Sequence, residues 1–206
     1  MSASSSSSGH LRVMPTACAS ANDIELARQN LSAFVGGQAE NASRRLGFSW
    51  RATATAPATF VELQSEHTVC AYAGLPLRVS SRFCDTTIYV DAAGNHAMRF
   101  WHDTSHVALG LDFTPEDEME LGCYHLGVLR SRGFDASTLE HRLLHADTIG
   151  QTLCVATLGR FPRNQVGFAL AALEYGVDGA IEREAQRAVT SIAPPRRWTP
   201  PDGAAA

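Results

Sequence analysis

The sequence predicts an α+β fold in which a small antiparallel sheet packs against a mainly helical C-terminal half. Residues 86–90 are β-branched and aromatic, the turn-forming residues 91–95 follow, and an apolar segment continues to residue 101. This pattern is typical of a hairpin near residues 86–101. After residue 101, helix-capping signals recur, and each is followed by apolar residues at helical spacing.

Three further elements are predicted before the hairpin. A helix begins at Asn22 or Asp23 and ends at Gly36-Gly37. Residues 38–58 are interpreted as a connector, and the segment 60–70 fits either a strand or a short helix. Leu75 to Ser80 alternates between apolar and polar residues, which predicts a strand.

The C-terminal half is predicted to contain four helices. Thr114, Pro115 and Glu116 supply an N-cap, a proline at the first position and an acidic first turn, so a helix should run to about residue 132. A capping box at residues 137–140 predicts a second helix to about residue 158. The third should begin near residue 162 and the fourth should cover about residues 179–190.

The chain is expected to form one domain. Its 206 residues, of which 45% are hydrophobic, are enough for a single core. We predict a disordered Ser-rich leader over residues 1–21, a single globular α+β domain over 22–193, and a disordered Pro/Ala tail over 194–206.

Composition excludes several classes of protein. All 17 basic residues are arginine, and without lysine there is no P-loop lysine, kinase lysine or Schiff base. A GC-rich coding bias explains the absence, and selection against lysine modification inside a host cell is the alternative. A net charge of −4 and the lack of a long apolar run argue against general nucleic-acid binding and against a membrane span. We therefore expect a soluble, cytoplasmic protein, with delivery into a host cell as the alternative.

The histidines are the main functional signal. Five of the eight fall between residues 102 and 145. His102 and His106 have i,i+4 spacing, as do His141 and His145, and two imidazoles one turn apart can bind one divalent metal such as zinc or manganese. The candidate metal ligands are His102, His106, His125, His141, His145 and Asp147. The candidate catalytic carboxylates are Glu118 and Asp103, because a carboxylate can take a proton from a metal-bound water.

Each of these residues also has a structural interpretation. His125 lies on an apolar helix stripe and fits a hydrogen-bonded core histidine. The acidic residues 116–120 complement a helix dipole. Asp147 falls on a mostly apolar face and needs a partner, which we predict to be Gln151 one turn later. The four histidines of the two i,i+4 pairs fit helix capping or partly solvated faces.

The doublet His102-Asp103 is similar to the one in HD-type metal phosphohydrolases, which pair an adjacent His-Asp with another histidine and a later aspartate. Asp147 could match the later aspartate. That family is all-helical, however, whereas this doublet follows a predicted strand and no histidine-bearing helix precedes it. We therefore infer no membership from the doublet.

The residues leave two functions open. The first is an interaction protein, a regulator, inhibitor or effector that binds another protein through its helical surface. The alternative is a divalent-metal-binding protein, such as a metal-dependent hydrolase that uses the histidines and carboxylates. Neither the oligomeric state nor the presence of catalysis follows from the sequence.

Overall fold

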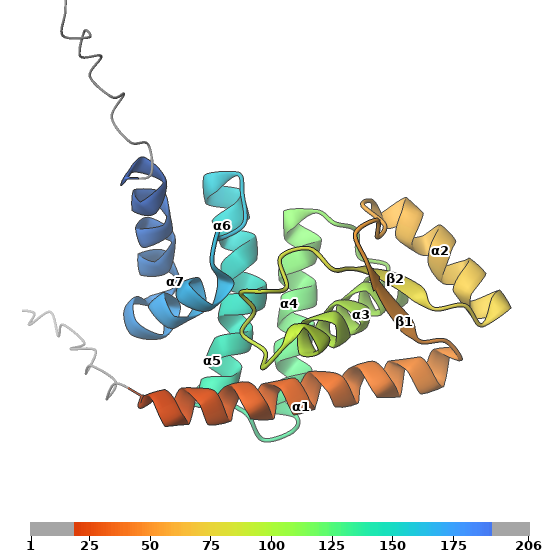
Figure 1. Ribbon diagram of the computed structural model, residues 1–206, viewed down its shortest axis with the longest axis horizontal. Helices are drawn as coiled ribbons and strands as arrows, with labels where there is room; N and C mark the ends of the chain where they lie inside the picture. Colours follow the sequence, from red (N-terminus) through yellow and green to blue (C-terminus); the bar gives the residue numbers. More distant parts are fainter. Residues whose placement is uncertain (1–18, 191–206) are drawn as a thin grey trace, which may run out of the picture.

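The computed structural model describes residues 19–190, which are mostly helical and contain one two-stranded sheet (Figure 1). Along the chain, the elements are α1 (Ala21–Leu46), β1 (Trp50–Thr53), α2 (Phe60–Ala73), β2 (Leu77–Ser80), α3 (Ala92–Leu109), α4 (Pro115–Arg130), α5 (Leu139–His145), the π-helical segment η1 (Ala146–Gly150), α6 (Gln151–Leu158) and α7 (Gln165–Thr190).

The α+β class is confirmed in outline, but the sheet is parallel and lies elsewhere in the chain. β1 pairs with β2 in parallel, with Trp50 opposite Leu77 and Arg51 opposite Arg78. Parallel strands need a crossover connection, and α2, which the sequence left unassigned, provides it. The predicted antiparallel hairpin at 86–101 is wrong, because residues 92–101 belong to helix α3.

Local contacts explain this error. The side chain of Asp91 accepts a hydrogen bond from the backbone N–H of Gly94, so the turn-like residues 91–95 form a helix N-cap. The β-branched segment before it does not form a strand. Its carbonyl oxygens at Ile88 and Tyr89 instead accept hydrogen bonds of 2.9 and 2.8 Å from the Arg28 side chain.

Helix α1 continues well beyond its predicted end at Gly36-Gly37. It begins with a capping box formed by Ser20 and Asp23, as its sequence allows, and ends at Leu46. Two interior glycines cost about 1 kcal/mol each relative to alanine. Burial of several apolar side chains offsets this cost, because a fully buried Leu or Val contributes about 1.5–3 kcal/mol. The buried side chains of α1 are Ala27, Leu31, Val35, Ala39 and Ala42.

The helices of the C-terminal half largely follow the sequence pattern. The hydroxyl of Thr114 caps α4 by accepting from the N–H of Asp117. The second predicted helix is present over residues 139–158, but its cap is Thr138 and its centre is η1. The last two predicted helices form α7, which contains a non-helical residue at Gly176.

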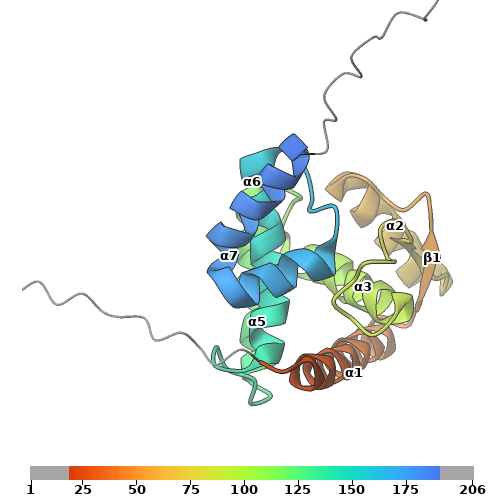
Figure 2. The ribbon, with the colours of Figure 1, turned by 60° about the vertical axis from the view of Figure 1, so that its left-hand side comes forward.

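Helix α3 lies between the two larger hydrophobic clusters of the fold. Trp101 packs with Leu31 and Leu129 on one side, where α1, α4 and α5 meet. Phe100 packs with Leu63 and Leu77 on the other side, toward α2 and β2. Figure 2 shows α3 above α1, with α2 and β1 on one side and the C-terminal helices on the other. The helix that carries the His102-Asp103 doublet is therefore central to the fold.

Two sequence predictions fall largely outside the described residues. These are the Ser-rich leader, of which only residues 19–21 are described, and the tail over residues 194–206. The cysteines at positions 70, 84, 123 and 154 are free thiols. Within residues 19–190, no helix combines the length and the apolar composition that a membrane span needs.

Candidate metal centre

Three side chains from two helices converge on one point. His102 and His106 come from α3, and Glu118 comes from α4. The Nε2 atoms of the two histidines are 3.0 Å apart. The two carboxylate oxygens of Glu118 lie 3.3 Å from His102 Nε2 and 3.4 Å from His106 Nε2. In the part of the chain that the structure describes, this is the group of His, Cys, Asp and Glu side chains with a geometry suited to a metal.

Local sequence positions all three side chains. The i,i+4 spacing on α3 brings His102 and His106 to the same face, as predicted. Glu118 is the fourth residue of α4, and the Thr114 cap therefore sets its position. The short connection between the two helices keeps the start of α4 close to the end of α3.

The ring of His106 is fixed by a backbone hydrogen bond. Its side chain is fully buried, and its Nδ1 atom lies 3.0 Å from the carbonyl oxygen of Leu111. A carbonyl oxygen only accepts, so Nδ1 carries the proton. In the neutral ring, Nε2 therefore presents a lone pair toward His102 and Glu118. Phe113 packs edge-on against the same ring, at a centroid distance of 4.8 Å.

A second histidine, His125, contacts the ring of His102 on the side away from Glu118. His125, from α4, places its Nε2 atom 3.3 Å from His102 Nδ1. His125 is fully buried, its ring centroid lies 4.1 Å from that of Trp101, and its Nδ1 atom has no hydrogen-bond partner. His125 thus contacts the cluster through the nitrogen of His102 that faces away from Glu118.

Glu118 and the neighbouring histidines shift one another's pKa values. Burial acts to raise the pKa of Glu118, but when His102 and His106 are protonated their hydrogen bonds and positive charges outweigh it and hold that pKa well below its usual range. Burial acts to lower the pKa of His102, but the hydrogen bond and the charge of Glu118 raise it. For His125, burial dominates and its pKa is lowered well below the usual value. The cluster therefore contains a carboxylate, a basic imidazole and a neutral imidazole.

Two further carboxyl groups are partly buried near the histidines. Burial raises the pKa of Asp103 to about 6, against the opposing charges of His102 and His106. Burial likewise raises the pKa of Asp147 to about 6. Asp147 lies in η1 and accepts hydrogen bonds from the hydroxyl of Tyr89 at 2.9 Å and from the amide of Gln151 at 2.7 Å. The predicted pairing of Asp147 with Gln151 is confirmed.

The remaining predicted ligands do not join the group. His141 and His145 lie on α5 with their predicted i,i+4 spacing, but neither belongs to the group that meets ligand distances among the described residues. Asp147 and Asp103 are outside that group as well. Sequence reasoning assigned Glu118 to catalysis and did not include it among the candidate ligands. The available signal was its spacing of seven residues, about two turns, from His125 on one helix face.

The donor set suits a transition metal. Two imidazole nitrogens and one carboxylate oxygen form the ligand combination of many catalytic zinc sites and of non-haem iron(II) sites. Three protein ligands also leave coordination positions open for water or substrate. Calcium and magnesium, in contrast, prefer oxygen ligands. The residues of the cluster therefore fit zinc or a similar ion.

Comparisons with protein families, curated proteins and solved structures found no match to this chain. The helical setting of His102-Asp103 removes one difference from the HD-type pattern. The carboxylate that meets the histidines nevertheless comes from Glu118, not from the doublet.

Proposed function

We propose that this protein binds a divalent transition metal, most suitably zinc, through His102, His106 and Glu118. The observation that carries the proposal is the convergence of the three side chains: the two histidine Nε2 atoms are 3.0 Å apart, and they lie 3.3 and 3.4 Å from the two different carboxylate oxygens of Glu118. Ligands about 2.05 Å from a tetrahedral zinc ion lie roughly 3.3 Å from one another. The contacts between the three side chains are close to that separation, and one ligand atom from each side chain lies within 4.8 Å of the other two.

The local charge also favours a cation. With both imidazoles neutral, His106 directs a lone pair toward His102, and Glu118 adds a full negative charge. A divalent ion would neutralise that charge and take up the lone pairs. The hydrogen bond from His106 Nδ1 to the Leu111 carbonyl is the kind of outer contact that orients ligating histidines.

For the chemistry we propose a metal-dependent hydrolase, which the sequence suggested as the alternative. A metal of this kind lowers the pKa of a bound water toward neutrality. Glu118 is used as a ligand, so the role of general base that the sequence suggested for it passes to Asp103. Asp103 follows the proposed ligand His102 directly on α3, and the charges of both His102 and His106 act on its carboxyl group.

Metal analysis of protein prepared without a histidine tag tests the proposal. We expect about one equivalent of bound zinc and a rise in the melting temperature on zinc addition, because binding to the folded state stabilises it. The variants His106→Ala and Glu118→Gln should lose both effects. His141→Ala is the matched control, since it removes a buried histidine outside the cluster. Less than about 0.2 equivalents, with no thermal shift, would contradict the proposal.

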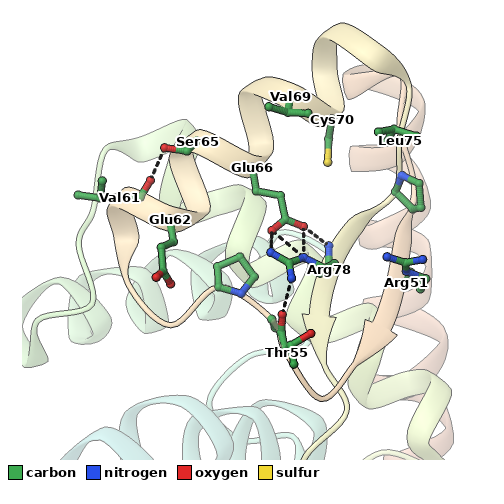
Figure 3. A pocket seen from close by; sticks show the side chains of 13 residues that line it. Arg51, Thr55, Val61, Glu62, Ser65, Glu66, Val69, Cys70, Leu75 and Arg78 are labelled. Atoms are coloured by element: carbon green, nitrogen blue, oxygen red, sulfur yellow. Dashed lines mark hydrogen bonds and ion pairs between the residues drawn. The ribbon is translucent and has the colours of Figure 1, made fainter.

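A second candidate function is the binding of another protein, which the sequence also suggested. The observation in its favour is a groove of about 790 Å³ between α2 and the sheet (Figure 3). Apolar side chains on its walls are unusually exposed: Val61 at 71%, Val69 at 55% and Leu75 at 54%. Clustered apolar exposure of this kind marks interaction sites.

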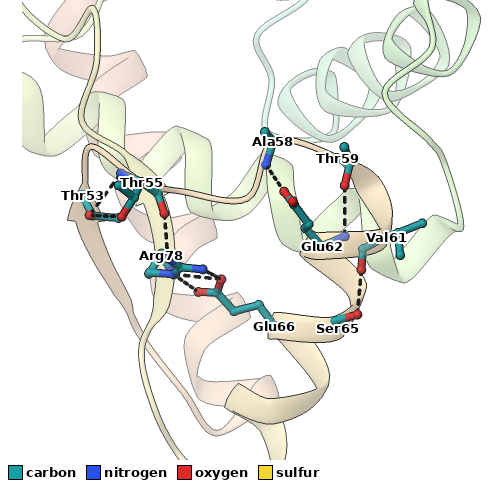
Figure 4. A network of polar contacts seen from close by, with 9 residues as sticks. All are labelled: Thr53, Thr55, Ala58, Thr59, Val61, Glu62, Ser65, Glu66 and Arg78. Carbon is teal, nitrogen blue, oxygen red and sulfur yellow. Dashed lines mark hydrogen bonds and ion pairs between the residues drawn. The ribbon is translucent and has the colours of Figure 1, made fainter.

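Four charged side chains line the groove, and two of them, Arg78 and Glu66, pair with each other, whereas Arg51 and Glu62 do not. Arg78 makes a bidentate pair with Glu66, and its guanidinium also donates to the carbonyl of Thr55 (Figure 4). Arg51, its neighbour across the sheet, is exposed and forms no ion pair with any described residue. We therefore propose that the groove binds a partner segment with apolar side chains and a carboxylate directed at Arg51.

Selection from a displayed library of random peptides tests this second function. We expect selected peptides to combine apolar and acidic residues, to lose binding to Val69→Asp, and to change charge preference with Arg51→Glu. Tyr72→Asp is the control, because Tyr72 is the most exposed large side chain of α2 and does not line the groove. Peptides that bind the Val69→Asp variant as well as the native protein would refute the groove as the site.

A further inference from the structure

His125 has an unusual environment for a core histidine. It is fully buried, yet only one of its ring nitrogens has a partner. That partner is Nδ1 of His102, at 3.3 Å from His125 Nε2. Buried polar atoms are almost always paired, so a ring that leaves one nitrogen unpaired calls for an explanation.

The positions of the ring protons on the three histidines follow from the hydrogen bond between His106 and Leu111. Leu111 offers only a carbonyl oxygen, so His106 carries its proton on Nδ1 and directs a lone pair from Nε2 toward the centre. A metal bound at the centre also needs the lone pair of His102 Nε2. His102 must then carry its proton on Nδ1, and that N–H requires an acceptor.

We propose that His125 is the positioning residue of the metal centre: its Nε2 accepts a hydrogen bond from His102 Nδ1 and so holds His102 as an Nε2 ligand. This inference rests on the proposed function. An accepting Nε2 also places the proton of neutral His125 on Nδ1, the ring nitrogen that has no hydrogen-bond partner among the described residues.

The same geometry distinguishes positioning from ligation. His125 reaches the nitrogen of His102 that points away from Glu118, and it is not among the side chains that meet ligand distances. It therefore acts on the metal through His102. Packing against Trp101, at a centroid distance of 4.1 Å, fixes the orientation in which its Nε2 faces His102. The two ligating histidines would thus be oriented differently, one by a backbone carbonyl and the other by a side chain.

Zinc titration of two matched variants tests the proposal. His125→Leu fills much of the same space without an acceptor, and we expect its zinc dissociation constant to rise by about 10- to 100-fold, as is usual for loss of an outer-shell partner. His125→Gln places an amide oxygen near the position of Nε2, so it should restore most of the affinity. His141→Leu, which removes a buried histidine elsewhere, should leave the affinity unchanged.

Cobalt spectra and nitrogen NMR complete the test. The absorption spectrum of the cobalt-substituted protein should be the same in His125→Gln as in the native protein, because the ligands do not change. NMR of the native zinc-loaded protein should show the proton of His125 on Nδ1 and that of His102 on Nδ1. This last measurement needs no variant, so it decides the matter even where His125→Leu fails to fold.

The outcomes separate the two proposals. A native protein that binds no zinc would overturn the proposed function and this inference together. A native protein that binds zinc, with an affinity unchanged in a folded His125→Leu variant or with the His125 proton on Nε2, would overturn the inference alone.

Discussion

The carbonyl oxygen of Leu111 lies 3.0 Å from Nδ1 of His106. This contact depends on how α3 ends. Gly110 adopts a left-handed conformation with φ of 71°, and the backbone N–H groups of Gly110 and Leu111 both donate to the carbonyl of His106. The chain therefore turns back after α3, and the carbonyl oxygen of Leu111 faces the imidazole ring of His106. A helix C-cap thus orients a candidate ligand.

Replacing Gly110 tests this relationship. An alanine in the left-handed region costs about 1–2 kcal/mol of stability, and relief of the strain would move Leu111 away from His106. We expect Gly110→Ala to lower both the free energy of unfolding and the affinity for zinc. Gly159→Ala is the control, because Gly159 ends α6 with a similar φ of 68° and has equally open surroundings. It should lose stability only. Equal zinc affinities in the two variants would argue against the role of Leu111.

Zinc affinity should depend on pH through His102. Glu118 raises the pKa of His102, and a protonated imidazole cannot ligate a metal. Affinity should therefore increase as the pH rises toward the raised pKa of His102 and level off above it. Below that pKa, the apparent dissociation constant should grow by about tenfold per pH unit. Calorimetric titrations between about pH 5 and pH 9 measure it, and an affinity independent of pH over this range would count against His102 as a ligand.

Asp147 should make the metal-free protein less stable as the pH rises. Its pKa is raised to about 6 in the folded state, so between about pH 4 and pH 6 the folded protein binds more protons than the unfolded chain. This contribution to stability is fully present below the unfolded pKa and is lost as the pH passes the folded one. We expect Asp147→Asn to match the native protein near pH 4 and to exceed its stability by roughly 1–2 kcal/mol near pH 7.

Urea unfolding of both proteins across this pH range checks the prediction. Asparagine can still accept from Tyr89, and Gln151 can rotate its amide to donate or accept, so the packing should survive. A difference between the two proteins that does not change with pH would show that Asp147 keeps an ordinary pKa.

Arg28 should be important for stability, although it is far from the proposed centre in sequence. Its guanidinium donates to the carbonyl oxygens of Ile88 and Tyr89, in the irregular segment before α3. We expect Arg28→Met to cost about 2–4 kcal/mol, because it leaves partly buried carbonyls unpaired. Arg44→Met is the control: Arg44 is mostly exposed on the same helix, and its loss should stay within about 0.5 kcal/mol. Thermal or urea unfolding gives both values.

Capping signals were the most reliable guide to the fold. The cap at Thr114 and the start of α4 were predicted, because a hydroxyl, a proline and an acidic turn act within a few residues of one another. The predicted hairpin failed for the opposite reason. Asp91 serves equally in a turn or as a helix cap, and the choice depended on the burial of Phe100 and Trp101 by distant segments.

The candidate centre was likewise predictable only in part. The i,i+4 spacing of His102 and His106 marked a pair on one helix face whenever that segment is helical. The same spacing at His141 and His145 looked equally promising, yet that pair lies outside the cluster. Nothing in the local pattern separates the two pairs, because the carboxylate that meets only one of them, Glu118, comes from another helix.

The sequence by itself determined the start and cap of α4, the helical character of residues 139–158 and the i,i+4 spacing of the two histidine pairs, because these depend on interactions over one or two turns. Only the tertiary structure decided that the sheet is parallel, that Glu118 meets His102 and His106, and that His125 lies behind His102. These features depend on how α3 packs between α1, α4 and the sheet. Such packing is set by the summed burial of side chains far apart in the chain, which no local spacing encodes.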